Sequence, residues 1–320
     1  MSKKNYTDVG GGIDAEKGIA LLAEIFAAIG FDIKDEESYN ALAELAERSG
    51  ERSCAYRAGA TIHGRCWKLG GGLEVWSVLY ESDRELYCAD CRPAFRGRYV
   101  HKVYPWEMAE YCVDGEAVVR GALGGHAEVL FELQNLTEIK PNMLRAAQLP
   151  VGLAGLALSV RVEPETERHP IAEARMAAEF QLNQLGLLSR PPRHAEGPGD
   201  ISVLKGQSRF IPASGLQEYG DMPCENDYLI EGAVLAWRNL RNPVTGAELV
   251  WIYVDAGSVR VELVANRRLV HGSLRRGAAI SATAWLQGHF LVNAEVSARY
   301  EGIDPDFVRG DSWTLLRRGN

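Results

Sequence analysis

The clearest chemical pattern in this chain is a pair of cysteines separated by two residues, Cys88-Ala-Asp-Cys91. Upstream, His63-Gly-Arg-Cys66 has the same spacing, so the whole pattern is H-x2-C-x21-C-x2-C. Zinc is commonly held in a tetrahedron of four thiolate and imidazole ligands at such spacings. These four residues are therefore the candidate metal ligands, and zinc is the one cofactor that the sequence suggests.

The expected backbone around these cysteines argues against a zinc site. Residues three apart in a regular strand point to opposite faces, so each pair would need a turn before its members could converge. Residues 85–88 are instead expected to form a strand that leaves into a loop fixed by Pro93, with Cys88 as a small apolar filler. A redox pair is disfavoured because no βαβ pattern surrounds it. Zinc binding and buried thiols remain the two alternatives.

A group of ionisable residues follows the second cysteine pair on the same expected loop. The group consists of Asp90, Arg92, Arg96, Arg98 and His101. Loops at strand ends often carry function, so an anion or carboxylate site is one interpretation. The favoured interpretation is an exposed loop with salt bridges.

A second candidate site lies in residues 231–299. This stretch contains eight arginines and five acidic residues, which gives it a net charge of +3. The rest of the chain therefore carries a net charge of −11. Several aromatic residues fall on the expected strands, and outward-facing rings would make a stacking platform for single-stranded nucleic acid. Trp251 and Tyr253 share one face, however, and core packing is the favoured role. The candidate binding residues are Arg238, Arg241, Trp251, Arg267, Arg268, Arg275 and Arg276.

Catalytic motifs are not evident in the chain. There is no HExxH and no GxSxG, and the seven histidines occur singly. No catalytic or cofactor-binding residue is therefore predicted, and enzymatic activity is left open.

The composition is that of an ordinary folded protein. The 320 residues are 46% apolar and 24% charged, which allows two or three domains with a buried core. A net charge of −8 argues against coating nucleic acid or an anionic membrane with the whole surface. The first residues lack the apolar core of a signal peptide, and no apolar run approaches a membrane span. A cytosolic protein with reduced cysteines is expected.

The elements that would position these residues begin with two helices. Apolar spacing predicts helices at 13–28 and 36–48, which form a helical hairpin. Strands are predicted at 54–62, 64–68, 73–80 and 85–88, with glycine-rich or polar turns between them. Together these make an N-terminal α+β domain over residues 1–105.

Two β segments with a similar order of signals follow. Residues 114–162 and 231–291 each have a hairpin, a charged middle and a return strand that starts at glycine. Duplication of one unit and two independent antiparallel sheets both explain the likeness. The spacing of strands and turns in 231–291 resembles the oligonucleotide/oligosaccharide-binding (OB) folds, and 114–162 resembles them less closely. Each segment is expected to be a small barrel or curled sheet.

The predicted fold class is thus α+β and β-rich, with four regions. They are the N-terminal domain (1–105), a first β module with a helix at 171–187 (106–188), a linker (189–215) and a second, OB-like module (216–320). The leading functional hypothesis is a cytosolic, non-enzymatic protein whose tandem β modules bind another protein or self-associate. The alternatives are single-stranded nucleic-acid binding by the second module, and a metal-dependent enzyme or zinc-stabilised domain around Cys88.

Overall fold

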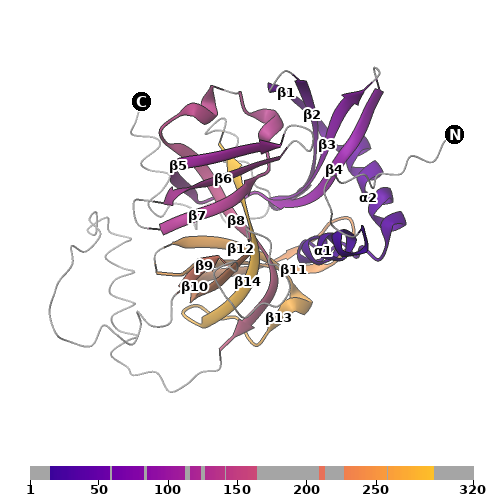
Figure 1. Cartoon of the computed structure of the whole chain (residues 1–320). Coiled ribbons are helices and arrows are strands. Elements are labelled where there is room, and N and C mark those ends of the chain that lie inside the picture. The colour runs from indigo at the N-terminus through magenta and orange to yellow at the C-terminus, as the bar shows by residue number, and fades with distance from the viewer. Residues whose placement is uncertain are drawn as a thin grey trace, which may run out of the picture.

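The computed structural model describes residues 15–57, 60–82, 85–111, 116–123, 127–140, 142–163, 209–212, 227–257 and 259–291. These residues form two α-helices and two sheets of four and ten strands (Figure 1). The β-rich character predicted from the sequence is confirmed. Neither described helix is long and apolar enough to cross a lipid bilayer.

The helices α1 (Ala15–Ala28) and α2 (Glu36–Ser49) lie where the apolar spacing predicted them. A capping box starts α2, since Ser38 N donates to Asp35 Oδ1 (2.8 Å) and Asp35 N donates to Ser38 Oγ (3.0 Å). The two bonds satisfy backbone donors near the helix start that have no partner within the helix. Gly50 closes the other end by donating its N–H to the last turn.

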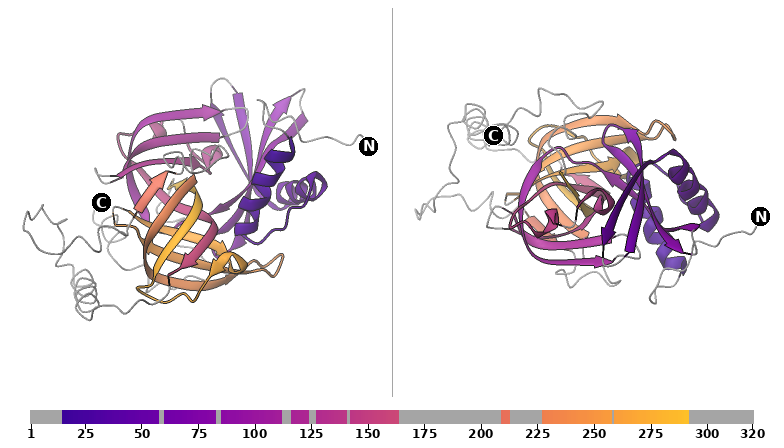
Figure 2. Two further views of the ribbon diagram at one scale, coloured as in Figure 1. Left: turned by 60° about the horizontal axis from the view of Figure 1, so that its bottom comes forward. Right: turned by 90° about the horizontal axis from the view of Figure 1, so that it is seen from above.

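The four-stranded sheet is an antiparallel meander. Its strands, in spatial order, are β1 (Glu51–Arg57), β2 (Ala60–Gly70), β3 (Leu73–Ser82) and β4 (Glu85–Phe95). One face buries Val75 and Phe95 with residues of α1 and α2, which lie along that side of the sheet in Figure 2. The other face meets the remainder of the molecule closely, because a Cβ added to Gly64 would lie 2.3 Å from Thr137 Oγ1.

Two strand boundaries differ from the prediction. The single strand predicted at 54–62 is two strands, since β1 ends at Arg57 and β2 begins at Ala60. The predicted exit into a loop after Cys88 is wrong, because β4 continues to Phe95 and places Pro93 opposite Val75. Proline has no backbone N–H and is tolerated on edge strands, and β4 is an edge of its sheet.

The ten-stranded sheet contains all later strands. They are β5 (Val100–Tyr111), β6 (Glu116–Leu123), β7 (Ala127–Leu133), β8 (Leu149–Val162), β9 (Arg209–Pro212), β10 (Asp227–Arg241), β11 (Glu248–Asp255), β12 (Arg260–Asn266), β13 (Val270–His271) and β14 (Ala279–Phe290). Short 3-10 helices η1 (Leu136–Glu138), η2 (Met143–Arg145) and η4 (Arg267–Leu269) connect some of them.

Backbone pairings within this sheet close two rings of strands. The first ring runs β5–β6–β7–β14–β8 and returns to β5. The second ring runs β10–β11–β12–β8–β14 and returns to β10. The long strands β8 and β14 therefore belong to both rings, and they pair with each other antiparallel from Ile280↔Val162 to Phe290↔Val151.

The two rings have the same order of strands. Each begins with a three-strand antiparallel meander, followed along the chain by a long return strand that pairs with the first strand of its own meander. The third strand of each meander then pairs in parallel with the return strand of the other (β7 with β14, β12 with β8). This reciprocal order supports the duplication that the sequence left open.

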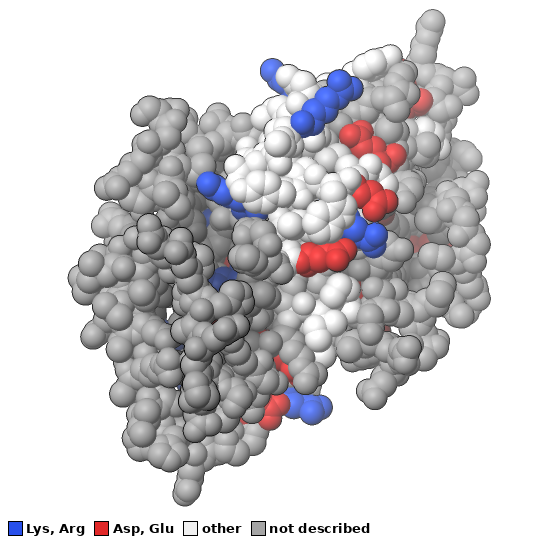
Figure 3. All heavy atoms as spheres, turned by 60° about the vertical axis from the view of Figure 1, so that its left-hand side comes forward, with Lys and Arg blue, Asp and Glu red and all other residues white. Residues whose placement is uncertain are grey.

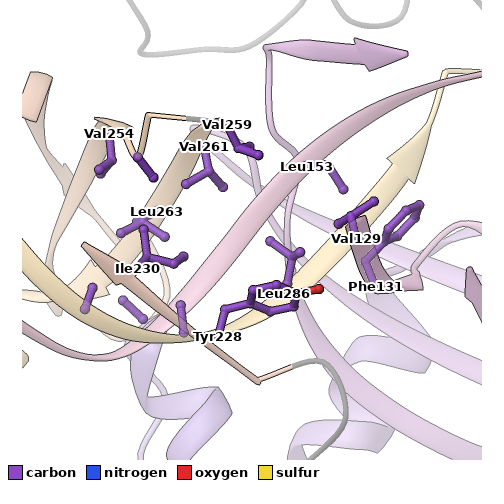
Figure 4. Close-up of a cluster of buried hydrophobic side chains, with 14 of the residues drawn as sticks. Val129, Phe131, Leu153, Tyr228, Ile230, Val254, Val259, Val261, Leu263 and Leu286 are labelled. Atoms are coloured by element: carbon purple, nitrogen blue, oxygen red, sulfur yellow. The ribbon is translucent and has the colours of Figure 1, made fainter. Parts of the chain in front are cut away.

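One apolar core runs through both rings (Figure 4). It includes Phe131 of the first ring and Leu263 of the second, and burial of this apolar surface is the main stabilising term of the two rings. The core is tightly filled where the rings meet. A Cβ on Gly288 of β14 would lie 2.3 Å from the ring of Phe131.

Two asparagines attach the end of α1 to the second ring. Asn242 Nδ2 donates to Ile29 O (2.8 Å), and Asn266 Nδ2 donates to Ala27 O (3.1 Å). These carbonyls belong to the unpaired group at a helix C-terminus. Gly30 follows with φ +87°, and a Cβ there would lie 2.7 Å from Ala247 Cβ. The helix is therefore fixed against the hairpin of β10 and β11.

The predicted domain boundaries can be compared with the strands only in part. β5 spans the boundary predicted at 105/106, and β9 falls inside the predicted linker 189–215. The helix predicted at 171–187 and the rest of that linker lie outside the described residues.

Candidate functional site

The four candidate zinc ligands are not gathered around one point. Cys66 lies opposite Trp76 in the register, whereas Cys91 lies opposite Ser77, the next residue of β3. Neighbouring residues of a strand point to opposite faces, so the two cysteines lie on different faces of the four-stranded sheet. Within the described part of the chain, no group of three or more His, Cys, Asp or Glu residues could hold a metal ion.

In this arrangement Cys66 and Cys91 are buried thiols and Cys88 is a partly buried one. Cys88 Sγ donates to Asp90 O (3.3 Å), and burial raises the pKa of Cys88 to about 12. Burial also raises the pKa values of Cys66 and Cys91. Ligands to zinc must be thiolates, and these environments favour the protonated form. The remaining candidate, His63, lies on β2 with Nε2 3.8 Å from Glu81 Oε2.

The exposed loop predicted after Cys91 is wrong. Arg92, Arg96 and Arg98 are only 2%, 4% and 6% exposed. They lie in residues 92–99, which leave the four-stranded sheet and enter the ten-stranded one, and which we call the joining segment. A buried charge is costly unless it is paired, so the partners of these arginines decide what the segment does.

Two of the three arginines pair with buried glutamates. Arg92 Nη1 bonds to Glu132 Oε1 of β7. Arg96 Nε lies 2.8 Å from Glu74 Oε1 of β3, whose other oxygen accepts from Trp76 Nε1 (3.0 Å). The joining segment thus holds the four-stranded sheet to the first ring by two buried ion pairs.

A third glutamate holds the joining segment to the second ring. Glu262 of β12 is fully buried and accepts from the backbone N–H groups of Arg98 and Tyr99 and from Trp251 Nε1 (2.9 Å). Burial raises the pKa of Glu262 to about 7, although these donors favour the ionised form. Tyr99 stacks on Tyr253 with ring centroids 3.8 Å apart. Trp251 and Tyr253 are therefore structural, and Trp251, a candidate binding residue, is not accessible.

A buried histidine lies on the first-ring side of this junction. His289 Nε2 is 3.2 Å from Asn135 Nδ2 and 4.0 Å from Glu138 Oε2. Burial and the nearby charge of Arg96 lower the pKa of His289, so its ring is neutral near pH 7. The side chain of Asn135 also donates from Nδ2 to Phe290 O (2.9 Å) and accepts from Phe290 N at Oδ1 (2.9 Å). This cluster closes the end of β14 and is structural.

An open hollow lies at one end of the second ring. It has a volume of about 400 Å³ and is formed by the hairpin of β10 and β11 together with η4. Its lining residues are Trp237, Asn239, Leu240, Arg241, Glu248, Leu249 and Arg267. The side chain of Trp237 is 40% exposed. The hollow thus contains an accessible tryptophan and two arginines that come from different elements.

Further candidate arginines lie beside this hollow. Arg276 Nε donates to Leu235 O (2.9 Å), and Gly277 N donates to Val234 O (2.7 Å), so the loop before β14 lies against β10 just before Trp237. Arg268 follows Arg267 in η4, and Arg238 lies on the other face of β10. The arginine-rich end, as we call it, comprises Trp237, Arg241, Arg267, Arg268, Arg275 and Arg276.

The sequence identified the arginines of this end but not its aromatic residue. Trp251 was the candidate, and it is buried, whereas Trp237 is accessible. A signal was present in the chain, because Trp237 stands four residues before Arg241 and just ahead of the Asn-Pro turn. Residues that flank a hairpin turn are more often accessible than those in the middle of a strand.

No protein-family model, no curated protein and no solved structure matches this chain. The function is therefore inferred from the geometry of the site.

Proposed function

We propose that this chain is a binding protein that holds an anionic polymer at the arginine-rich end of its second ring. The observation that carries the proposal is the hollow whose lining includes Arg241, Arg267 and an accessible Trp237. Clustered arginines attract polyanions over the Debye length and pair with their oxygen atoms. The chain as a whole is acidic, so attraction is limited to this end.

The order of strands in the second ring supports an OB-like barrel as its fold. A three-strand meander (β10, β11, β12) is closed by β8 and β14, with β8 parallel to β12. OB folds bind ligands on the second and third strands and on the loop between the first two. Here Trp251 and Tyr253 of the second strand are buried, whereas the hairpin of β10 and β11 lines the hollow. Fold alone does not establish function, and the hollow is the stronger support.

Binding of a base-free polyanion tests the proposal. Fluorescein-labelled long-chain polyphosphate is expected to bind in low salt, with an affinity that falls as salt rises. The double variant R241Q/R267Q is expected to weaken binding at least tenfold. The matched control is R52Q/R145Q, which removes the same charge from exposed arginines of β1 and η2. An equal loss of polyphosphate affinity in both double variants would mean that only the net charge of the chain matters. That result would refute a local binding site.

Protein contact is the second candidate function, and a specific observation favours it. Tyr104 and Trp106 of β5 are 45% and 58% exposed. Figure 3, in which the side with β5–β7 comes forward, shows an uncharged patch bordered by acidic and basic side chains. Aromatic residues are enriched in protein interfaces. If this surface mediates self-association, light scattering should show a concentration-dependent mass that W106S abolishes. A cytosolic location remains a prediction.

A further inference from the structure

The accessible ring of Trp237 indicates what kind of polymer the arginine-rich end takes. In the described residues, β14 pairs with β10 only as far as Ala233. The second half of β10 therefore extends beyond the closed part of the second ring of strands. Trp237 lies in that half, opposite Ile252 of β11. The apolar core leaves one side of its indole side chain uncovered. We infer that the ligand is a single-stranded nucleic acid, with one base stacked on Trp237 and adjacent phosphates against Arg241 and Arg267. This inference rests on the proposed function.

Two arginines of the hollow suit the phosphate groups next to a stacked base. Arg241 comes from β10 and Arg267 from η4, and both are exposed and line the same hollow. Arg241 Nε donates to Gly246 O (3.1 Å), which orients the side chain and uses only one of its five N–H donors. Phosphate oxygens are the acceptors that a guanidinium group prefers. The backbone of a short oligonucleotide could thus contact both arginines while one of its bases stacks on Trp237 in the same hollow.

The geometry favours a single strand over a duplex. In a duplex the faces of the bases are stacked on each other, and a protein aromatic side chain cannot reach them without unstacking. An unpaired base offers its face to a tryptophan whatever its identity. The hollow of about 400 Å³ has room for a base beside Trp237 but has only a few lining residues. Little sequence preference is therefore expected.

One acidic residue in the lining provides an internal check. Glu248 is exposed and lies opposite Arg241 in the register of β10 and β11. Its carboxylate repels a phosphate in the same hollow. The variant E248Q is therefore expected to bind oligonucleotides a few-fold more tightly than the original chain, a gain that damage to the fold would not produce.

The test measures fluorescence anisotropy of labelled (dT)12, of a 12-base-pair duplex and of polyphosphate with the full chain in low salt. A stacked base contributes about 5- to 150-fold in affinity, so W237A should lose that factor for (dT)12 and keep polyphosphate binding. W237F retains a stacking face and should stay within a few-fold of the original chain. The matched control, W106A, removes an accessible tryptophan of the first ring and should leave (dT)12 binding unchanged.

The outcomes separate this inference from the function on which it rests. If polyphosphate binds at the arginines but (dT)12 binds no more tightly than the duplex, the base-stacking inference is wrong and the proposed function stands. The same conclusion follows if W237A and W106A behave alike. If neither polymer binds in low salt, both fail. Preference for (dT)12 that depends on Trp237 and on Arg241 with Arg267 supports both.

Discussion

Replacement of Glu262 by glutamine tests how the joining segment is held to the second ring. Glu262 is fully buried, and burial raises its pKa from 4.5 to about 7. Because the pKa is higher in the folded chain than in the unfolded one, the folded state binds the proton more tightly. The stabilisation is complete below pH 4.5 and is lost as the pH rises through 7. A shift of this size corresponds to a free energy of unfolding on the order of 3 kcal/mol.

The variant E262Q removes this titration and keeps the shape of the side chain. Its amide still has an oxygen for the N–H groups of Arg98 and Tyr99, but its NH2 group would face Trp251 Nε1, an unmade bond that costs about 1–3 kcal/mol at every pH. The original chain is therefore expected to be the more stable at pH 5. Between pH 5 and 8 the free energy of unfolding of the original chain should fall by about 3 kcal/mol relative to that of E262Q.

Urea unfolding at several pH values, followed by tryptophan fluorescence, measures this difference. Other titrating groups are common to both chains and cancel in the comparison. The control is E248Q, which makes the same substitution at an exposed glutamate of β11. Parallel curves for the original chain and E262Q would refute the reasoning. So would a relative gain by the original chain at high pH, because the three donors would then outweigh burial.

Three further changes test other parts of the structure. R96A removes the arginine that pairs with the buried carboxylate of Glu74 and should lower the free energy of unfolding by about 3–5 kcal/mol. A loss below 1 kcal/mol, measured by urea unfolding, would contradict a buried ion pair between Arg96 and Glu74. G288A places a methyl group against Phe131 and should cost about 1–3 kcal/mol, and an unchanged melting temperature would show that the rings are not closely packed there. Exposed Cys54 should react with a thiol reagent at pH 8 far faster than Cys88, whose pKa is raised to about 12 by burial. The variant C54S should therefore lose part of the fast phase of this reaction, whereas C88S should keep it. Equal losses in the two variants would be inconsistent with this structure.

Local signals were sufficient for the elements themselves. The helix predicted at 36–48 was found because the signals that start and end a helix act within one turn of the backbone, as Asp35 and Gly50 do in α2. The predicted strands were recovered in outline because alternation and turn glycines act between neighbours. Gly59 lies between Arg57 and Ala60, but this one glycine was not taken as a turn signal, and two strands were predicted as one.

The environment of the joining segment was not predictable in the same way. Arg92 and Arg96 pair with Glu132 and Glu74, which lie 40 and 22 residues away along the chain. Glu262 binds the backbone of Arg98 from 164 residues away. Five ionisable residues close together in residues 90–101 suggest a solvated loop, and the three arginines among them can be buried only because other strands supply their partners. A charged residue within an apolar strand, such as Glu132 or Glu262, was the available signal.

By itself, the sequence determined the β-rich composition, the two helices, most strand positions and the excess of arginine in residues 231–299, because periodicity, capping and charge are local properties. The tertiary structure decided that β8 and β14 serve two rings at once, that Cys66 and Cys91 lie on different faces of their sheet, and that Trp237 rather than Trp251 reaches solvent. The physical reason is that either face of a strand can be buried. Which face meets water depends on the strands, helices and joining segment that the rest of the chain packs against it.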